Sequence, residues 1–161
     1  MRGKPAEIPW TDASTGIVGR TAAVIVVGID GSPSSWDAFD WAAGESTRLS
    51  AKLIAVHVQP LPQPFLAIET PFAYAASKEA SDQLAEQLGH EVGRRALELD
   101  AKVTLIRESG DAAVVLAEIA RLLTADLIVV GKSAKRVHHL AGSIGRRLIF
   151  SQDAPAVVVV P

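Results

Sequence analysis

The fold of this chain is decided by residues 23–33, which read Ala23-Val24-Ile25-Val26-Val27-Gly28-Ile29-Asp30-Gly31-Ser32-Pro33. A continuous apolar run without alternation is typical of a strand that is covered on both faces, as the strands of parallel sheets are. Pro33 suits the first position of a helix, where its missing N–H is no loss, and Ser32 can cap that helix. The stretch therefore predicts a buried parallel strand that leads directly into a helix running to about Leu49.

The same alternation of strand and helix continues to the end of the chain. Further strands are predicted at residues 52–58, 102–107, 126–131 and 156–160, and further helices at about 74–99, after an N-cap at Asp111, and near 143–151. This alternation with right-handed crossovers predicts an α/β fold, a single five-stranded parallel sheet with helices on both faces. Such sheets bind ligands at the carboxyl ends of their strands, where the strand order reverses.

Apolar stripes predict which faces of the helices are buried. In the second helix the stripe recurs every four residues and consists of Ala76, Ala80, Leu84, Leu88 and Val92. In the third helix it consists of Ala112, Val115, Leu116, Ile119, Leu122 and Leu123. Trp36, Phe39 and Trp41 of the first helix are expected to pack on the sheet, which counts against a nucleic-acid surface built from stacking aromatics.

Composition limits the classes of function. With 161 residues the chain predicts one domain over residues 21–161, after a flexible N-terminal arm at residues 1–20 that Trp10 could pin to the surface. The net charge of −2 argues against a surface that neutralises duplex phosphates, so no DNA partner is expected. The absence of cysteine excludes disulfides, thiolate catalysis and cysteine metal sites. Because the apolar runs are far shorter than the ~20 residues of a membrane span, we expect a cytoplasmic protein without a membrane partner.

The stretch Gln59–Phe72 contains four prolines among apolar residues. Long excursions of this kind are often lids or binding loops, yet a plain surface crossover fits as well. Both interpretations stay open on the sequence alone.

Two strand ends carry the candidate site. Asp30 follows the first strand, where a carboxylate can accept from ribose hydroxyls or an adenine nitrogen, or can simply shape the turn and cap the helix. Gly142 and Ser143 stand directly before a helix, where exposed N–H groups and the helix dipole attract anions. Positive charge is added nearby by Lys132, Lys135, Arg136, Arg146 and Arg147. A Gly-Ser pair directly before a helix is also a common helix cap, so by itself this motif is weak evidence for an anion site.

Three other chemistries fit the sequence poorly. A Walker A loop ending at Gly131-Lys132-Ser133 would need a glycine at position 126, which is Asp126. A nucleophile elbow at Ser143 would need the serine directly off a strand, whereas about ten loop residues follow Gly131. The four histidines show no metal-ligand spacing, and His57 is most simply a hydrogen-bonded core or rim residue. No catalytic or metal-binding residue is therefore assigned.

Five elements in order carry a resemblance to a known family. They are Val27-Gly28-Ile29-Asp30-Gly31-Ser32, Val56-His57-Val58, Ala125-Asp126-Leu127-Ile128-Val129-Val130-Gly131, Gly142-Ser143 and Ala154-Pro155-Ala156-Val157-Val158-Val159-Val160. Over about residues 21–161 the chain thereby resembles the universal stress protein family. The resemblance implies a Rossmann-like fold of the adenine nucleotide alpha hydrolase type and a homodimer. Because the sequence supplies no positioned base and nucleophile for rapid hydrolysis, we expect a stress-response switch or binding module rather than an enzyme.

In one branch of that family the protein binds ATP through a loop that reads Gly, two residues, Gly, nine residues, Gly-Ser or Gly-Thr. By position, Gly131 matches the first glycine, and Asp30 matches the carboxylate on ribose or adenine. The nucleotide-binding residues that the resemblance implies are Gly28, Asp30, the base-facing Val58 and Val130, Gly131, Ala134, Gly142, Ser143, and Ile144, whose amide would face phosphate.

This sequence departs from the family pattern twice. Ala134 stands in place of the middle glycine, where a methyl group would come between the backbone and phosphate, and seven residues, Lys135–Ala141, replace nine. The implied ligand is ATP, with Mg²⁺ as its usual companion, or another adenine nucleotide such as AMP or cyclic AMP. The alternative is a ligand-free dimeric interaction module, as in the branch whose phosphate loop has degenerated.

The last strand, Ala156–Val160, predicts how the chain assembles. A bare apolar edge is a liability unless it is paired or covered. The resemblance implies that this strand pairs with its two-fold copy in a homodimer, and cover by the N-terminal arm is the alternative. The sequence identifies no downstream protein partner.

Overall fold

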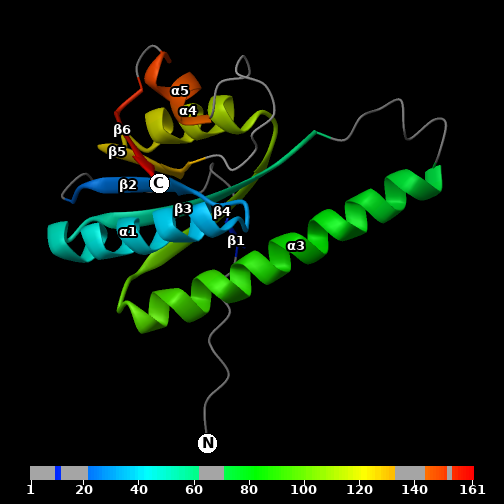
Figure 1. The fold of residues 1–161 in the computed structure, drawn as a ribbon, viewed down its shortest axis with the longest axis horizontal. Helices are drawn as coiled ribbons and strands as arrows, with labels where there is room; N and C mark the ends of the chain where they lie inside the picture. The colour runs from blue at the N-terminus through cyan, green and yellow to red at the C-terminus, as the bar shows by residue number, and fades with distance from the viewer. Residues whose placement is uncertain (1–9, 12–21, 62–70, 133–143, 152–153) are drawn as a thin grey trace, which may run out of the picture.

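Six parallel strands form one sheet in the order β1-β4-β3-β2-β5-β6 (Figure 1). The computed structural model describes residues 10–11, 22–61, 71–132, 144–151 and 154–161. The strands are β1 (Trp10–Thr11), β2 (Val24–Gly28), β3 (Lys52–Gln59), β4 (Val103–Ser109), β5 (Leu127–Gly131) and β6 (Ala156–Val160). The helices are α1 (Pro33–Leu49), α3 (Pro71–Glu98), α4 (Ala112–Leu122) and α5 (Ile144–Ile149). The predicted α/β class and its five strands are confirmed.

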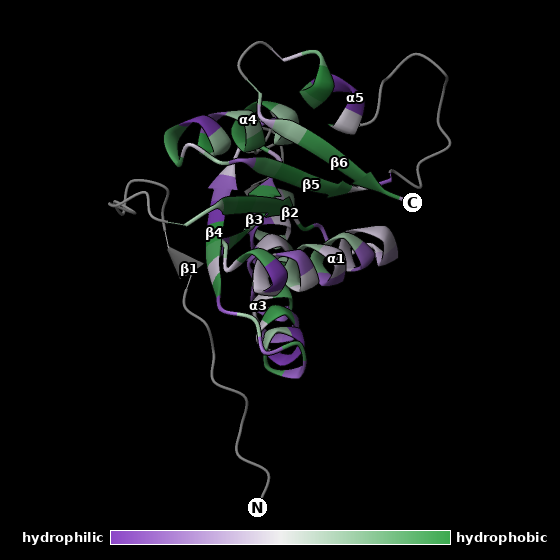
Figure 2. Ribbon diagram, turned by 90° about the vertical axis from the view of Figure 1, so that its left-hand side faces the viewer, coloured by the Kyte–Doolittle hydropathy of each residue, from purple (hydrophilic) through white to green (hydrophobic). Residues whose placement is uncertain are grey.

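Helices cover both faces of the sheet. On one face, Phe39 of α1 and Leu88 of α3 pack against strand residues such as Ile25 and Leu53. On the other face, Leu116 of α4 and Leu148 of α5 form a second hydrophobic cluster with strand residues. These strand residues include Val26, Ile54 and Ile128. Figure 2 shows the result, central strands that are hydrophobic between helices that carry hydrophilic residues on their outer sides. Burial on both faces explains why the strands lack polar alternation.

Side-chain caps begin two helices as predicted. The Ser32 hydroxyl accepts a hydrogen bond from the Ser35 N–H at 3.2 Å, with Pro33 as the first residue of α1. Asp111 caps α4, where its Oδ1 accepts from two backbone N–H groups of the first turn at 3.1 Å. Both caps lie directly after strands, so they also fix where the chain turns at the carboxyl end of the sheet.

The structure adds a sixth strand to the predicted five. Trp10 and Thr11 pair in parallel with Leu105 and Ile106 of β4. Two residues give no recognisable strand pattern, so only the pairing in three dimensions identifies β1. The other residues of the predicted N-terminal arm, and residues 62–70 of the predicted loop, lie outside the described residues.

The N-terminal half of α3 is exposed, so the burial predicted from its apolar stripe is wrong there. Ala76 and Ala80 are exposed and Phe72 is 87% exposed, whereas Leu88 and Val92 are buried. The helix has 28 residues and is about 42 Å long. The eight residues of β3 span about 26 Å, so α3 extends past the sheet that covers its other half (Figure 1).

Two more apolar residues predicted to be buried are exposed. Trp41 is 41% exposed and Leu122 is 59% exposed. The buried positions of α1 are 35, 38, 39, 42, 43 and 46, a helical spacing that leaves position 41 outside. The buried face of α4 includes Ala113 and Ala120 and is turned away from Leu122.

Candidate functional site

A cavity of about 340 Å³ opens at the carboxyl end of the sheet. It lies at β2, which pairs with β3 on one side and with β5 on the other, so it occupies the point where the strand order reverses. The ends of β2, β3 and β5 and the starts of α1, α4 and α5 form its walls. The lining residues are Gly28, Ile29, Asp30, Ser32, Ser34, Ser35, Val56, Val58, Ala112, Leu116, Val130, Gly131, Lys132 and Ile144.

The structure brings the described part of the predicted site together. Six of the predicted residues line this one cavity, namely Gly28, Asp30, Val58, Val130, Gly131 and Ile144. The other three, Ala134, Gly142 and Ser143, lie outside the described residues. Lys132, which the sequence analysis takes as a nearby charge, lines the cavity too.

Sequence reasoning missed the residues that two helices contribute. Ser34 and Ser35 lie in the first turn of α1, and Ala112 and Leu116 lie in α4. The two serines could have been found from their place just after the first strand. The α4 residues gave no such signal, because their stripe predicts only that they pack on the sheet.

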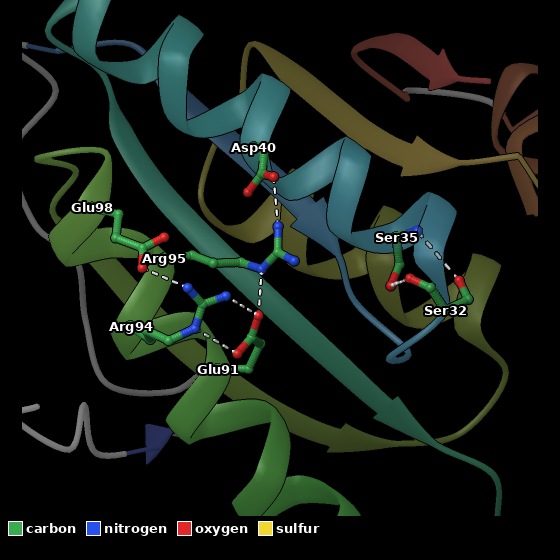
Figure 3. Close-up of polar contacts among 7 residues, drawn as sticks. All are labelled: Ser32, Ser35, Asp40, Glu91, Arg94, Arg95 and Glu98. Atoms are coloured by element: carbon green, nitrogen blue, oxygen red, sulfur yellow. Dashed lines mark hydrogen bonds and ion pairs between the residues drawn. The ribbon is translucent and has the colours of Figure 1, made fainter.

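The turn after β2 holds Asp30 at the mouth of the cavity. Its Oδ1 accepts a hydrogen bond from the Ser32 N–H at 2.9 Å. The Ser35 N–H donates to the Ser32 hydroxyl, and the Ser35 hydroxyl donates to the Ser32 carbonyl (Figure 3). Asp30 therefore shapes the turn with one carboxylate oxygen while it lines the cavity, and Ser32 rather than Asp30 caps α1.

The charge on Asp30 is stabilised by its surroundings. Partial burial acts to raise the pKa of Asp30, but hydrogen bonds from Ser32 and Ser35 and the nearby His57 outweigh it, and the pKa lies below its ordinary value. The group is therefore an ionised acceptor at neutral pH. It suits a ligand that offers hydroxyl or amino donors.

His57 lies beneath the Asp30 turn on the other face of the sheet. It is 4% exposed, and its Nδ1 lies 3.1 Å from the Ile29 carbonyl, which can only accept, so Nδ1 carries the proton. Burial, with the charge of Arg107, lowers the pKa of His57. The predicted role of a hydrogen-bonded core residue is confirmed. Its side chain points opposite to Val56 and Val58, which line the cavity.

Gly131 is a close-packing position between β5 and α1. A Cβ on this residue would lie 2.3 Å from the Ser34 carbonyl oxygen and 2.7 Å from the Ser35 nitrogen. The Ser34 hydroxyl donates to the Lys132 carbonyl at 2.8 Å and thereby ties the two elements together. Packing of the chain on itself is thus enough to require glycine here, independently of any ligand.

The cavity combines three kinds of surface. Val56, Val58, Leu116 and Val130 give it apolar walls, and Asp30 gives it an acidic rim. The serine hydroxyls and Lys132 add polar and positive groups at the first turn of α1 and the end of β5. Such an arrangement suits a ligand with a flat apolar part, hydroxyl groups and an anionic end.

The described part of the chain holds neither a metal-ligand cluster nor a helix that could span a membrane. It contains no group of three or more histidine or carboxylate side chains placed to hold a metal ion. Among the helices described, none has the length and apolar character to cross a membrane.

The fold and cavity define a Rossmann-like α/β protein with a ligand-sized opening at the switch point of its sheet. The model of the universal stress protein family matches residues 23–160, and the chain belongs to that family. Comparison with curated proteins gives no match.

Solved structures share the fold over nearly their whole length. A universal stress protein in complex with cAMP is 28% identical, with a TM-score of 0.67 over 87% of this chain and 97% of that chain. A universal stress protein family member from Burkholderia pseudomallei is 20% identical, with a TM-score of 0.69 over 89% and 99% of the two chains. The universal stress protein from Archaeoglobus fulgidus in complex with dAMP is 20% identical, with a TM-score of 0.56 over 86% and 98%.

Proposed function

We propose that this protein binds an adenine nucleotide in the cavity at the carboxyl ends of β2 and β5. The observation that carries the proposal is the convergence of six separately predicted residues on one opening. They come from β2, β3, β5, α5 and the turn after β2, so their meeting is not a consequence of closeness in sequence. The relatives solved with cAMP and with dAMP support an adenine nucleotide as the class of ligand.

The surfaces of the cavity suggest how each part of the nucleotide is held. The purine would lie between Val58 and Val130, where apolar walls match its flat faces. The ribose hydroxyls would donate to the ionised Asp30. The phosphate would lie toward Lys132 and the start of α5 at Ile144. The nucleotide would be ATP with Mg²⁺, AMP or cAMP, and binding measurements choose among them.

The proposed role is a binding module or switch in the stress response rather than an enzyme. Among the described residues that line the cavity, Asp30 is the one carboxylate, and its lowered pKa makes it a weak base. Among the described residues, His57 is a second possible base close to Asp30, but it lies on the other face of the sheet. Phosphate release from ATP should therefore stay near the rate without protein, and rapid turnover would contradict this part of the proposal.

Isothermal titration calorimetry with AMP, cAMP and ATP tests the binding. Asp30→Asn keeps an oxygen for the Ser32 N–H but loses the charge, and we expect it to weaken binding about ten-fold, as loss of a charged hydrogen bond does. Val58→Trp fills the base region and should abolish binding. Asp37→Asn makes the same chemical change at an exposed position of α1 and should leave affinity unaltered. If the wild-type protein gives no heat with any of the three nucleotides, the proposal is wrong.

Ala134 and the short loop leave the ligand-free interaction module as the competing function. Ala134→Gly separates the two, because it restores the middle glycine of the family pattern. Binding by the wild-type protein supports the nucleotide module. Binding that begins only in Ala134→Gly assigns the natural chain to the ligand-free branch.

For assembly we propose a homodimer through β6. Within the described sheet β6 pairs with β5 alone, and its Val159 is exposed. Large apolar side chains are exposed on the elements that flank it, Trp41 and Leu49 on α1 and Ile149 and Phe150 at the end of α5. A second copy paired along β6 would cover both the edge and these side chains.

A single proline substitution in the edge strand β6 tests this assembly. The Val160 carbonyl accepts from the Lys132 N–H, so Val160 faces β5 and Val159 directs its own N–H outward. Val159→Pro removes an outward donor without breaking the ladder to β5. Light scattering should give a dimer for the wild-type protein and a monomer for Val159→Pro. A wild-type monomer at micromolar concentration would contradict the proposal.

We further propose that the protein is located in the cytoplasm, which cell fractionation tests.

A further inference from the structure

An ion pair joins α5 to the start of α4, and both helices contribute to the wall of the cavity. Arg147 of α5 places its Nη1 2.7 Å from Oδ2 of Asp111, the N-cap of α4, across 36 positions of sequence. Ala112, next to Asp111, and Ile144, one turn before Arg147, both line the cavity. The ion pair therefore spans the wall of the cavity that α4 and α5 make together.

Asp111 uses its two carboxylate oxygens for different purposes. Oδ1 accepts from the N–H groups of Ala113 and Val114, which caps α4, and Oδ2 accepts from Arg147. The hydrogen bond from Arg147 is the main reason that the pKa of Asp111 lies below its ordinary value. The cap holds Asp111 in place on α4, so the arginine binds to a carboxylate with a fixed position.

α5 is a short helix that packs on α4, β5 and β6. It has six residues, too few for a helix that is stable by itself. Leu148 is fully buried, and Gly145 lies so close to Val159 that a Cβ would be 2.7 Å from its Cγ2. Ile149 and Phe150 point largely into solvent. These buried contacts hold α5 on the sheet, and the ion pair of Arg147 adds a polar connection to the start of α4.

We propose that Arg147 and Asp111 are positioning residues for the cavity, and that their ion pair holds α5 against α4 so that Ile144, one turn before Arg147, stays in the wall. Neither residue needs to touch a ligand for this. The consequence for nucleotide affinity rests on the proposed function, whereas the effect on α5 does not. The two consequences can therefore be measured separately.

Substitutions can remove the ion pair from either side. Arg147→Met keeps most of the side-chain length and loses the charge. Asp111→Asn loses the charge but keeps an oxygen for the cap, since asparagine is as good an N-cap as aspartate. Arg147→Lys is the conservative variant that keeps a cation in reach of Asp111. The matched control is Arg121→Met, which removes the same charge from the exposed far end of α4.

Amide hydrogen exchange measured by NMR on the ligand-free protein tests the position of α5. The Phe150 and Ser151 N–H groups donate to carbonyls of α5 and report on this helix. We expect Arg147→Met and Asp111→Asn each to speed their exchange about two- to five-fold, the range for an exposed ion pair, with no further gain in the double variant. Arg147→Lys should restore most of the protection. Unchanged exchange, or the same increase in Arg121→Met, would overturn the proposal.

Calorimetric titration of AMP into the same proteins tests the consequence for binding. We expect the Kd to rise two- to five-fold in Arg147→Met and Asp111→Asn, with melting temperatures near that of the wild type, and to recover in Arg147→Lys. Unaltered affinity in these variants would overturn the proposal for the site while leaving nucleotide binding in place. If the wild-type protein binds neither AMP, cAMP nor ATP, the proposed function fails and the exchange measurement alone decides whether the ion pair positions α5.

Discussion

Replacing Gly131 with alanine should lower the folding stability of the protein even in the absence of a ligand. The added Cβ would lie 2.3 Å from the Ser34 carbonyl oxygen, and ordinary contact begins near 3.4 Å. Because the clashing atoms are backbone, the first turn of α1 must move by about 1 Å, and overpacking of this kind costs about 1–3 kcal/mol. The movement also strains the 2.8 Å hydrogen bond from Ser34 to the Lys132 carbonyl, which adds about 1 kcal/mol.

Urea unfolding measures this cost. For Gly131→Ala we expect the free energy of unfolding to fall by about 2–4 kcal/mol, which for a chain of this size lowers the melting temperature by roughly 4 °C or more. Gly44→Ala is the matched control on α1. Nothing lies within 4 Å of a Cβ at Gly44, so that variant should gain about 0.5–1 kcal/mol of helix stability.

Two results would refute this reasoning. Gly131→Ala with the stability of the wild type would mean that the contact with Ser34 does not require glycine. Loss of AMP affinity in a variant of unaltered stability would mean that the glycine serves a ligand rather than the packing of α1.

Three further changes test contacts in other parts of the fold. Asp126→Ala removes the carboxylate that accepts from the Val24 N–H at 2.9 Å at the start of β2, and it should cost about 1–2 kcal/mol in urea unfolding. Arg95→Met removes a guanidinium that is ion-paired to Asp40 of α1 (Figure 3) and lies 4.9 Å from the centroid of the Trp36 ring. We expect a loss of about 1 kcal/mol and a changed tryptophan fluorescence, and an unaltered spectrum would count against the contact. The wild-type protein should lose stability between about pH 7 and pH 5, because the folded-state pKa of His57 lies below its ordinary 6.5 and the unfolded chain takes up the proton first. His57→Gln should flatten that part of the profile, and an equal slope in this variant would assign the effect to other groups.

Much of the fold could be predicted because local signals agree with the global arrangement. The buried strand at residues 24–28, the caps Ser32 and Asp111 and the bounds of β6 all follow from sequence. What could not be predicted depends on where the sheet ends. The stripe of α3 is periodic throughout, yet only the half that lies over the sheet is buried, and no local pattern marks that limit.

The residues of the candidate site also divide into those that could be predicted from sequence and those that could not. Residues directly after strands, such as Asp30 and Gly131, could be predicted because parallel strands bring their carboxyl ends together. Ser34 could have been found from its place just after β2. Ala112 and Leu116 could not be predicted as lining residues, because the site is completed by contacts between distant parts of the chain. The hydrogen bond from Ser34 to the Lys132 carbonyl, 98 positions apart, is one such contact.

Nucleotide binding in the cavity at the ends of β2 and β5 is tested most directly by an NMR titration of the ¹⁵N-labelled protein with AMP, cAMP and ATP. We predict saturable amide shifts at Gly28, Asp30, Val58, Val130 and Ile144, with the exposed end of α3 near Phe72 unaffected. Spectra that stay unchanged with all three nucleotides, or shifts confined to residues away from the cavity, would contradict the account.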